Sequence, residues 1–184
     1  MINNTDSQLR GIRAVVIGGG TGSFTVLQGL KNYISNLTAI VNMVDDGGST
    51  GVLRDELGVL PPGDIRQCIV ALSTAPQLMR DLMNYRFENG TFEGHAFGNI
   101  LLSALEKVTG SFENAIESVA ELLSLKGKVI PVTTTEIRLG VTYTDPIDGK
   151  QVSIVGEENI GNSNFNNVDK LNFFLTPNAT INKD

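Results

Sequence analysis

The sequence predicts an α/β protein with a Rossmann-like, three-layer arrangement: a parallel sheet with helices on both faces, and a β-hairpin insertion. Three observations support this. A β-branched apolar run over residues 13–17 leads into a glycine-rich loop, a second apolar run over residues 38–44 ends at two aspartates, and amphipathic helical patterns fill the middle of the chain. Half of a nucleotide-type phosphate site consists of a strand, a glycine turn, a helix and a second strand that is followed by an acidic residue.

Two strands are predicted near the start of the chain, and helices are predicted after them. Residues 13–17 and 38–44 suit parallel strands that are covered on both faces. Between them, Phe24, Leu27 and Leu30 fall close to one face of a helix that starts near Thr21. Further helices are expected over residues 53–57, 65–72, 78–87, 99–108 and 112–125.

Two caps are expected in this helical region. Asp64, which closes the turn over residues 61–64, can cap the following helix, whose apolar stripe is Ile65, Cys68, Ile69 and Leu72. Ser111 can cap the helix over residues 112–125.

The last third of the chain changes to a strand-like pattern. Residues 128–132 form a short apolar run, and residues 137–143 alternate apolar and polar before a turn at Asp148, which predicts a β-hairpin. A loop over residues 159–167 and a final strand over residues 168–175 follow. Because a βαβ beginning needs further crossovers to cover both sheet faces, we expect residues 1–184 to be one domain that is the N-terminal portion of a larger one.

Composition restricts the classes of partner. The 184 residues are 41% hydrophobic and carry a formal net charge of -6, which argues against nucleic acid and against anionic membrane surfaces as general partners. No apolar run approaches the roughly 20 residues that span a bilayer, so no membrane insertion is expected. Cys68 has no second cysteine to pair with, and residues 1–8 are too polar for a secretory signal, so a cytoplasmic protein is expected. The oligomeric state stays open, and a homo-oligomer is compatible with the sequence.

The glycine-rich loop has a physical use as a phosphate site. Gly18, Gly19, Gly20 and Gly22 permit positive φ angles and close approach of backbone amides, and the hydroxyl of Thr21 adds a donor at the start of a helix. The alternative is a tight turn between strand and helix without a ligand. The sequence lacks the Gly-Lys-Ser/Thr ending of a P-loop.

The acidic pair after the second strand has two candidate roles. Asp45 and Asp46 lie where a Rossmann acid accepts from a ribose hydroxyl, and adjacent carboxylates can also hold magnesium. The alternative is an Asx turn closed by Gly47 and Gly48. The same glycines and Ser49 begin a second anion-accepting loop. No cofactor is fixed by this pattern, and magnesium is the candidate; which aspartate has which role stays open.

Three further side chains are candidate ligand contacts. Arg66 can reach a phosphate with both guanidinium arms, or can pair with Asp64 or Glu56 at the surface. His95 and Asn99 lie near glycines at the start of a predicted helix and can face a ligand, although a lone histidine often only packs.

Two other reactive side chains are given structural roles. Arg54 stands next to Asp55 and is expected on a solvated helix face. Cys68 lies on an apolar stripe and is expected in the core rather than as a nucleophile.

Four ordered motifs together resemble a known family. They are Gly-Gly-Gly-Thr-Gly at residues 18–22, Asp-Asp-Gly-Gly-Ser-Thr-Gly at 45–51, Leu-Pro-Pro-Gly-Asp-Ile-Arg at 60–66, and Gly-His with Gly-Asn at 94–99. In this order they resemble the gluconeogenesis factor family, the YvcK-like proteins, which is related to the 2-phospho-L-lactate transferases called CofD. The resemblance covers roughly residues 12–160.

The resemblance implies two possible functions. The gluconeogenesis factor branch implies a regulatory, cytoplasmic protein that binds a nucleotide sugar, UDP-N-acetylglucosamine, and is needed for growth on gluconeogenic carbon sources and for cell shape. The CofD branch implies a magnesium-dependent transferase that moves a phospholactyl group from a guanylylated donor to a deazaflavin precursor. In that case Asp45 and Asp46 are the catalytic and metal-binding candidates. Members of both branches are longer than this chain.

Overall fold

A three-stranded parallel sheet forms the centre of the structure, a computed structural model that describes residues 11–183. Its strands β1 (Arg13–Gly18), β2 (Asn36–Val41) and β3 (Lys128–Pro131) are in the order β1-β2-β3. Arg13 lies opposite Asn36, and Thr38 opposite Lys128. All three predicted strands are confirmed within a few residues. Residues 1–8, on which the argument against a secretory signal depends, lie outside the described residues.

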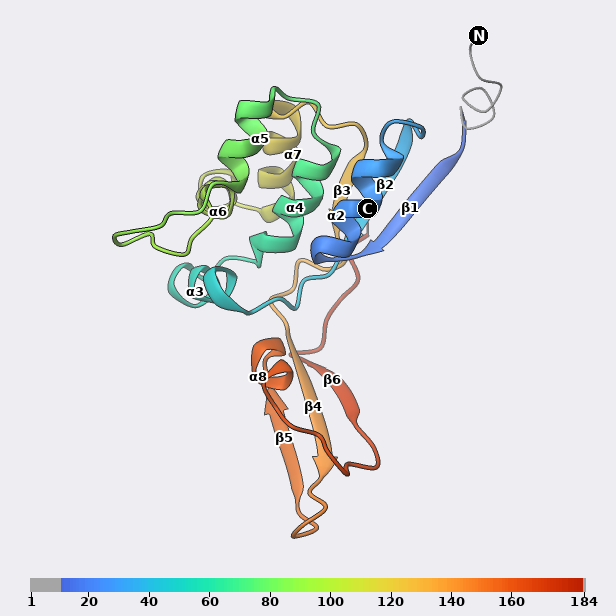
Figure 1. Cartoon of the computed structure of the whole chain (residues 1–184), viewed down its shortest axis with the longest axis vertical. Coiled ribbons are helices and arrows are strands. Elements are labelled where there is room, and N and C mark those ends of the chain that lie inside the picture. The colour runs from blue at the N-terminus through green and yellow to red at the C-terminus, as the bar shows by residue number, and fades with distance from the viewer. Residues whose placement is uncertain (1–10, 184) are drawn as a thin grey trace.

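The helices of the first two thirds of the chain form a compact body that packs against the sheet (Figure 1). They are α2 (Gly20–Leu30), α3 (Gly48–Leu57), α4 (Pro62–Leu72), α5 (Gln77–Asn84), α6 (Phe97–Thr109) and α7 (Phe112–Leu122). α2 packs on β1 and β2, α4 on β2 and β3, and α7 on β3. The helical character of this region is therefore confirmed, although α3 begins five residues earlier than expected, directly after Gly47.

Three local expectations can be compared with these helices. Ser111 caps α7 as expected, because its hydroxyl accepts from the backbone N–H of Asn114. Asp64 is not a cap: α4 begins at Pro62, whose fixed φ suits the first helical position, and Asp64 lies inside the first turn. The stripe of α4 is confirmed, and Cys68 is 0% exposed in the core, where burial raises the pKa of its thiol to about 12.

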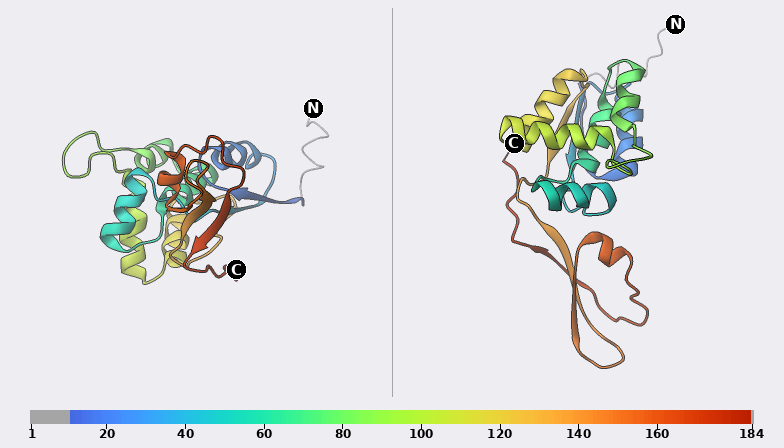
Figure 2. Two further views of the ribbon diagram at one scale, coloured as in Figure 1. Left: turned by 90° about the horizontal axis from the view of Figure 1, so that it is seen from below. Right: turned by 90° about the vertical axis from the view of Figure 1, so that its left-hand side faces the viewer.

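The last third of the chain forms an arm that projects from the helical body (Figure 2). Its strands β4 (Arg138–Thr144), β5 (Gln151–Val155) and β6 (Asn172–Thr176) make an antiparallel sheet in the order β5-β4-β6. The predicted hairpin and last strand are confirmed. The predicted loop over residues 159–167 is wrong at its start, because α8 (Glu157–Gly161) forms there and packs on β4 and β5.

The two faces of β1 differ in burial. Ala14 and Val16 pack against the core, whereas Val15 is 56% and Ile17 is 77% exposed. The α/β class, the parallel sheet and the hairpin are confirmed, but the described residues do not cover this second face of β1. Within the described part of the chain, no helix is both long and apolar enough to cross a membrane.

Candidate functional site

The glycine-rich loop and the acidic loop meet at one edge of the parallel sheet. Both follow the carboxyl ends of neighbouring parallel strands, β1 and β2, and Asn42 N–H donates to the carbonyl of Gly18. Gly18 and Gly20 have φ angles of +154° and +62°, and Gly20 starts α2 with Gly19 as its N-cap. Only the value at Gly20 lies well inside the left-handed region where glycine is strongly favoured.

Asp64 occupies the start of α2. A Cβ added to Gly19 would lie only 2.0 Å from Asp64 Oδ2, so the carboxylate contacts the glycine loop closely. Burial raises the pKa of Asp64, the charge of Asp45 raises it further, and a hydrogen bond from the backbone of Gly20 opposes both. Sequence reasoning missed this role, although Asp64 lies in one of the four motifs, because the residue was interpreted as a cap of its own helix.

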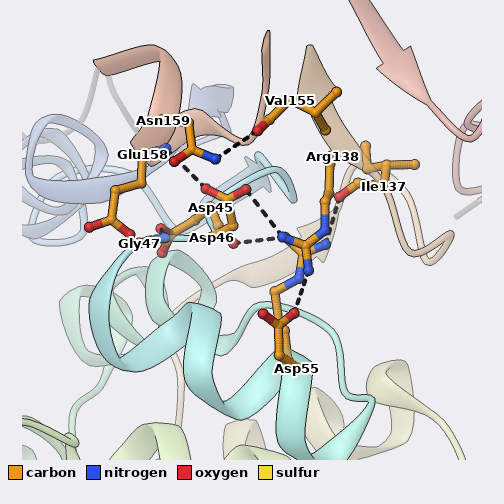
Figure 3. A network of polar contacts seen from close by, with 10 residues as sticks. Asp45, Asp46, Gly47, Asp55, Ile137, Arg138, Val155, Glu158 and Asn159 are labelled. Atoms are coloured by element: carbon orange, nitrogen blue, oxygen red, sulfur yellow. Dashed lines mark hydrogen bonds and ion pairs between the residues drawn. The ribbon is translucent and has the colours of Figure 1, made fainter. Parts of the chain in front are cut away.

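The two adjacent aspartates point to different neighbours. Asp45 Oδ1 accepts from Gly47 N–H at 3.1 Å, which is the Asx turn that the sequence left open. Asp46 instead turns toward the arm: Oδ1 accepts from the backbone N–H of Glu158 at 3.0 Å, and Oδ2 lies 3.6 Å from Arg138 Nη1 (Figure 3). The side chain of Asp46 is only 4% exposed.

This divergence bears on magnesium binding. The carboxylate of Asp46 is already engaged by a guanidinium and a backbone N–H. Among residues 11–183, no group of three or more acidic, histidine or cysteine side chains is placed to hold a metal ion. The assignment of magnesium to Asp45 and Asp46 stays a prediction, and these two residues as arranged do not fit a shared metal site.

Arg54 holds the acidic loop in place. It is 1% exposed, its Nη1 donates to the carbonyl of Asp45 at 3.0 Å, and its Nη2 donates to the carbonyl of Ile137 at 2.7 Å. The expectation of a solvated face for Arg54 is therefore wrong. Burial lowers the pKa of Arg54, as does the nearby charge of Arg138. The partner Ile137 is 83 residues away in sequence, so no local pattern could have revealed this role.

Arg66 is buried between two neutral amides. It is 7% exposed; its Nε donates to Asn99 Oδ1 at 2.9 Å and its Nη1 to Asn84 Oδ1 at 2.5 Å. Burial lowers the pKa of Arg66, as does the charge of Arg86, while Asp64 opposes them. The predicted surface ion pair with Asp64 or Glu56 is not formed. Arg66 and Asn99, two predicted ligand contacts, thus touch each other, and none of the described carboxylates forms an ion pair with the guanidinium, although the charge of Asp64 acts on it.

A second contact joins the acidic loop to the predicted histidine motif. Ser49 Oγ and His95 Nδ1 lie 3.0 Å apart. His95 is half-buried, at the end of the exposed loop that precedes α6. Of the remaining predicted contacts, Thr21 and Gly22 lie in the exposed first turn of α2, and Gly48 starts α3 with Gly47 as its N-cap.

The arm adds a further acidic side chain, Glu157, to this region. Burial raises the pKa of Glu157 on α8, and the charges of Asp45, Asp64 and Asp46 raise it further. Arg138 on β4 partly offsets this charge, since it pairs with both Asp46 and Asp55 (Figure 3). The arm therefore closes one side of the candidate site, a contribution that no sequence pattern predicted.

Comparison with known proteins decides the family. The family described as 2-phospho-L-lactate transferase CofD matches residues 14–183 of the chain, which includes the sheet, the helical body and the arm. The chain belongs to the CofD family. The resemblance inferred from the four motifs is thereby confirmed.

Relatives of this CofD-family chain carry a common name. The protein named "Putative gluconeogenesis factor" from Thermoanaerobacterium thermosulfurigenes is 51% identical over 131 residues, covering 71% of this chain and 41% of the relative. The "Gluconeogenesis factor" of Listeria monocytogenes is 43% identical over 154 residues, covering 78% of this chain and 48% of the relative.

A solved structure agrees with the fold. The crystal structure of a upf0052-family protein from Bacillus halodurans matches with a TM-score of 0.78 and 37% identity, covering 94% of this chain and 54% of that protein. The CofD-family chain thus spans about half or less of the length of these relatives.

Proposed function

We propose that this CofD-family chain carries the nucleotide-binding part of a regulatory, cytoplasmic gluconeogenesis factor whose ligand is UDP-N-acetylglucosamine. In this proposal the protein is needed for growth on gluconeogenic carbon sources and for cell shape, and it binds the nucleotide sugar without turnover. The names of the relatives support the gluconeogenesis assignment, and the motif resemblance supports the ligand.

One observation carries the ligand proposal: four motifs that are far apart in sequence meet at one sheet edge. Asp64 contacts the glycine loop at Gly19, and a Cβ on Gly63 would lie 2.6 Å from Thr50 Oγ1 of the acidic loop. Ser49 joins the acidic loop to His95, and Arg66 joins the fourth motif through Asn99. Such convergence at the carboxyl ends of parallel strands is where α/β proteins bind nucleotides.

The charges at this edge support a proposed orientation of the ligand. Arg66 offers a guanidinium that forms no ion pair with the described residues, which suits a phosphate oxygen. Asp64 at the start of α2 suits a neutral donor, such as a ribose or sugar hydroxyl, rather than a phosphate. In this proposal the diphosphate therefore lies toward Arg66 and the glycine backbone receives a hydroxyl-bearing group.

The test is ligand-induced stabilisation of the 184-residue chain. UDP-N-acetylglucosamine at 100 times its dissociation constant should add about 2.7 kcal/mol to the free energy of unfolding, a rise of about 5–10 °C in Tm. Gly20→Ala should abolish this rise because Gly20 has a φ of +62°, whereas Gly29→Ala, at the other end of α2 with no atom within 4 Å, should keep it. A wild-type chain that no uridine sugar stabilises would contradict the proposal.

The family description favours a second candidate, a 2-phospho-L-lactate transferase. In this proposal the chain acts with magnesium on a guanylylated phospholactate donor and a deazaflavin precursor. The two candidates are separated by incubating the chain with that donor, the acceptor and magnesium. Release of guanosine monophosphate, lost in Asp45→Asn, would establish the transferase and remove the purely regulatory assignment.

We also propose that residues 1–184 are one domain in which further chain of a longer protein covers the exposed face of β1. The support is the apolar, uncovered face of β1, where Val15 and Ile17 are exposed, together with the greater length of the relatives. A parallel sheet is normally covered on both faces. The test compares this chain with a full-length relative: the residue matching Ile17 should become protected from solvent exchange only in the longer protein.

A further inference from the structure

A polar cavity lies along α2, from Phe24 to the end of this helix that is distant from the glycine loop. It has a volume of about 610 Å³ and is lined by residues of α2, α4 and α5, where α4 packs on both α2 and α5 (Figure 1). Lys31, which ends α2, lines this cavity. Because α2 runs for 11 residues from Gly20, Lys31 lies about 16 Å from the glycine loop. The Lys31 end of the cavity is therefore distant from the glycine loop, whereas its other end reaches Asn84, whose Oδ1 accepts from Arg66 of the candidate nucleotide site.

The lining of this cavity is cationic and rich in neutral hydrogen-bonding groups. Its two charged side chains are Lys31 and Arg80, and none of the described residues that line it is acidic, although the chain has 20 acidic and 14 basic residues. Its neutral polar lining comes from six residues: Gln28, Asn32, Ser73, Thr74, Gln77 and Asn84. The hydroxyls of Ser73 and Thr74 donate to backbone carbonyls, so the free donors of this lining are side-chain amides. Phe24 and Val70 add an apolar wall.

The cations have no anionic partner within the described chain. Lys31 Nζ donates to the carbonyl of Ser73 at 2.8 Å, and Arg80 Nη1 donates to the carbonyl of Ala75. The ion pairs between described residues involve Arg138 and Lys150 instead. Asp81, the carboxylate next to Arg80 in sequence, accepts from Gln77 rather than from either cation.

Compensation of the negative C-terminal end of α4 does not account for the two positive charges of Lys31 and Arg80. Ser73 ends α4, and a helix end is equivalent to only about half a negative charge. Lys31 and Arg80 together exceed it, and Lys126 lies close enough to repel Lys31. Burial lowers the pKa of Lys31, and the charges of Arg80 and Lys126 lower it further, so this repulsion is not relieved inside the chain.

We propose that this cavity is a second anion site, which binds the phosphate group of a small organic phosphate. The guanidinium of Arg80 matches two phosphate oxygens, Lys31 supplies a point charge, and the side-chain amides of the wall donate to the remaining oxygen. The apolar wall at Phe24 contacts the carbon skeleton of the ligand. This site does not depend on the proposed function of the glycine loop.

The test is a titration of the ¹⁵N-labelled chain with inorganic phosphate and with glycerol phosphate, against sodium chloride at equal ionic strength. Saturable amide shifts are expected at Asn32, Thr74 and Gln77, with glycerol phosphate binding at least as tightly as inorganic phosphate. The double variant Lys31→Gln/Arg80→Gln should weaken binding at least about tenfold. Lys170→Gln, which removes an exposed charge elsewhere, should leave it unchanged.

Three results would overturn the proposal. They are shifts that follow ionic strength alone, phosphate-dependent shifts confined to the glycine loop, and a double variant that binds phosphate as tightly as the wild type. A free-phosphate complex tighter than the glycerol phosphate complex would overturn the assignment to an organic phosphate. Circular dichroism of the unliganded double variant checks that it is folded. If it is unfolded, the titration is repeated with the single variant Lys31→Gln, in which Arg80 keeps its hydrogen bond to the carbonyl of Ala75.

Discussion

Replacing Gly19 by alanine tests the contact between Asp64 and the glycine loop. The backbone itself tolerates alanine there, because the φ of Gly19 is -152°. The new Cβ, however, would lie 2.0 Å from Asp64 Oδ2 and 2.9 Å from Asp64 Cγ, while Asn42 Cβ at 3.5 Å is in ordinary contact. The carboxylate must therefore move by about 1 Å or more, which should cost about 1–3 kcal/mol of the free energy of unfolding.

A double-mutant cycle isolates this clash. In an Asp64→Ala background both offending atoms are gone, so Gly19→Ala should cost less than about 0.5 kcal/mol and the coupling energy should be about 1–3 kcal/mol. Urea unfolding followed by circular dichroism measures all four free energies. Gly22→Ala is the matched control: it lies in α2 with no atom within 4 Å and should stabilise the chain by up to about 1 kcal/mol. Equal losses for Gly19→Ala in both backgrounds would refute the reasoning.

Three further predictions concern protonation, reactivity and packing. The raised pKa of Asp64 means that the native state binds its proton at higher pH than the unfolded state, so stability should rise as pH falls toward 3.8; Asp64→Asn should flatten that rise in urea titrations. Thiol reagents should label Cys68 only upon unfolding, because it is 0% exposed with a pKa of about 12; fast labelling of the native chain would contradict this. Ile17 is 77% exposed and Leu37 is 1% exposed, so Ile17→Ala should lower the free energy of unfolding by less than about 1 kcal/mol and Leu37→Ala by about 2–5 kcal/mol, as measured by calorimetry.

The contrast between Cys68 and Arg54 shows what local patterns can predict. Cys68 belongs to an apolar stripe with helical spacing, and such a stripe must be buried, so its place in the core followed from sequence. Arg54 stands among acidic neighbours, which is typical of a solvated face. It is buried because the carbonyls of Asp45 and Ile137 need donors, and one of these lies 83 residues away.

The acidic pair shows the same difference within two residues. β2 ends at Val41 rather than at residue 44, but sequence spacing correctly placed Asp45 and Asp46 in the segment that follows β2, at the edge of the sheet where the glycine loop also lies. It could not separate their roles, because the separation comes from the arm. Arg138 and the backbone of Glu158 draw Asp46 away, while Asp45 folds back on Gly47.

The sequence by itself determined the α/β class, the parallel strands, the hairpin and the family, because each depends on periodicity, glycine position or motif order within a short segment. Tertiary structure alone decided that Asp64 reaches the glycine loop, that Arg66 is buried between two amides, and that Lys31 at the end of α2 and Arg80 on α5 share a cavity. These features depend on how helices and arm pack around the sheet, and packing joins residues whose separation in sequence carries no signal of their contact.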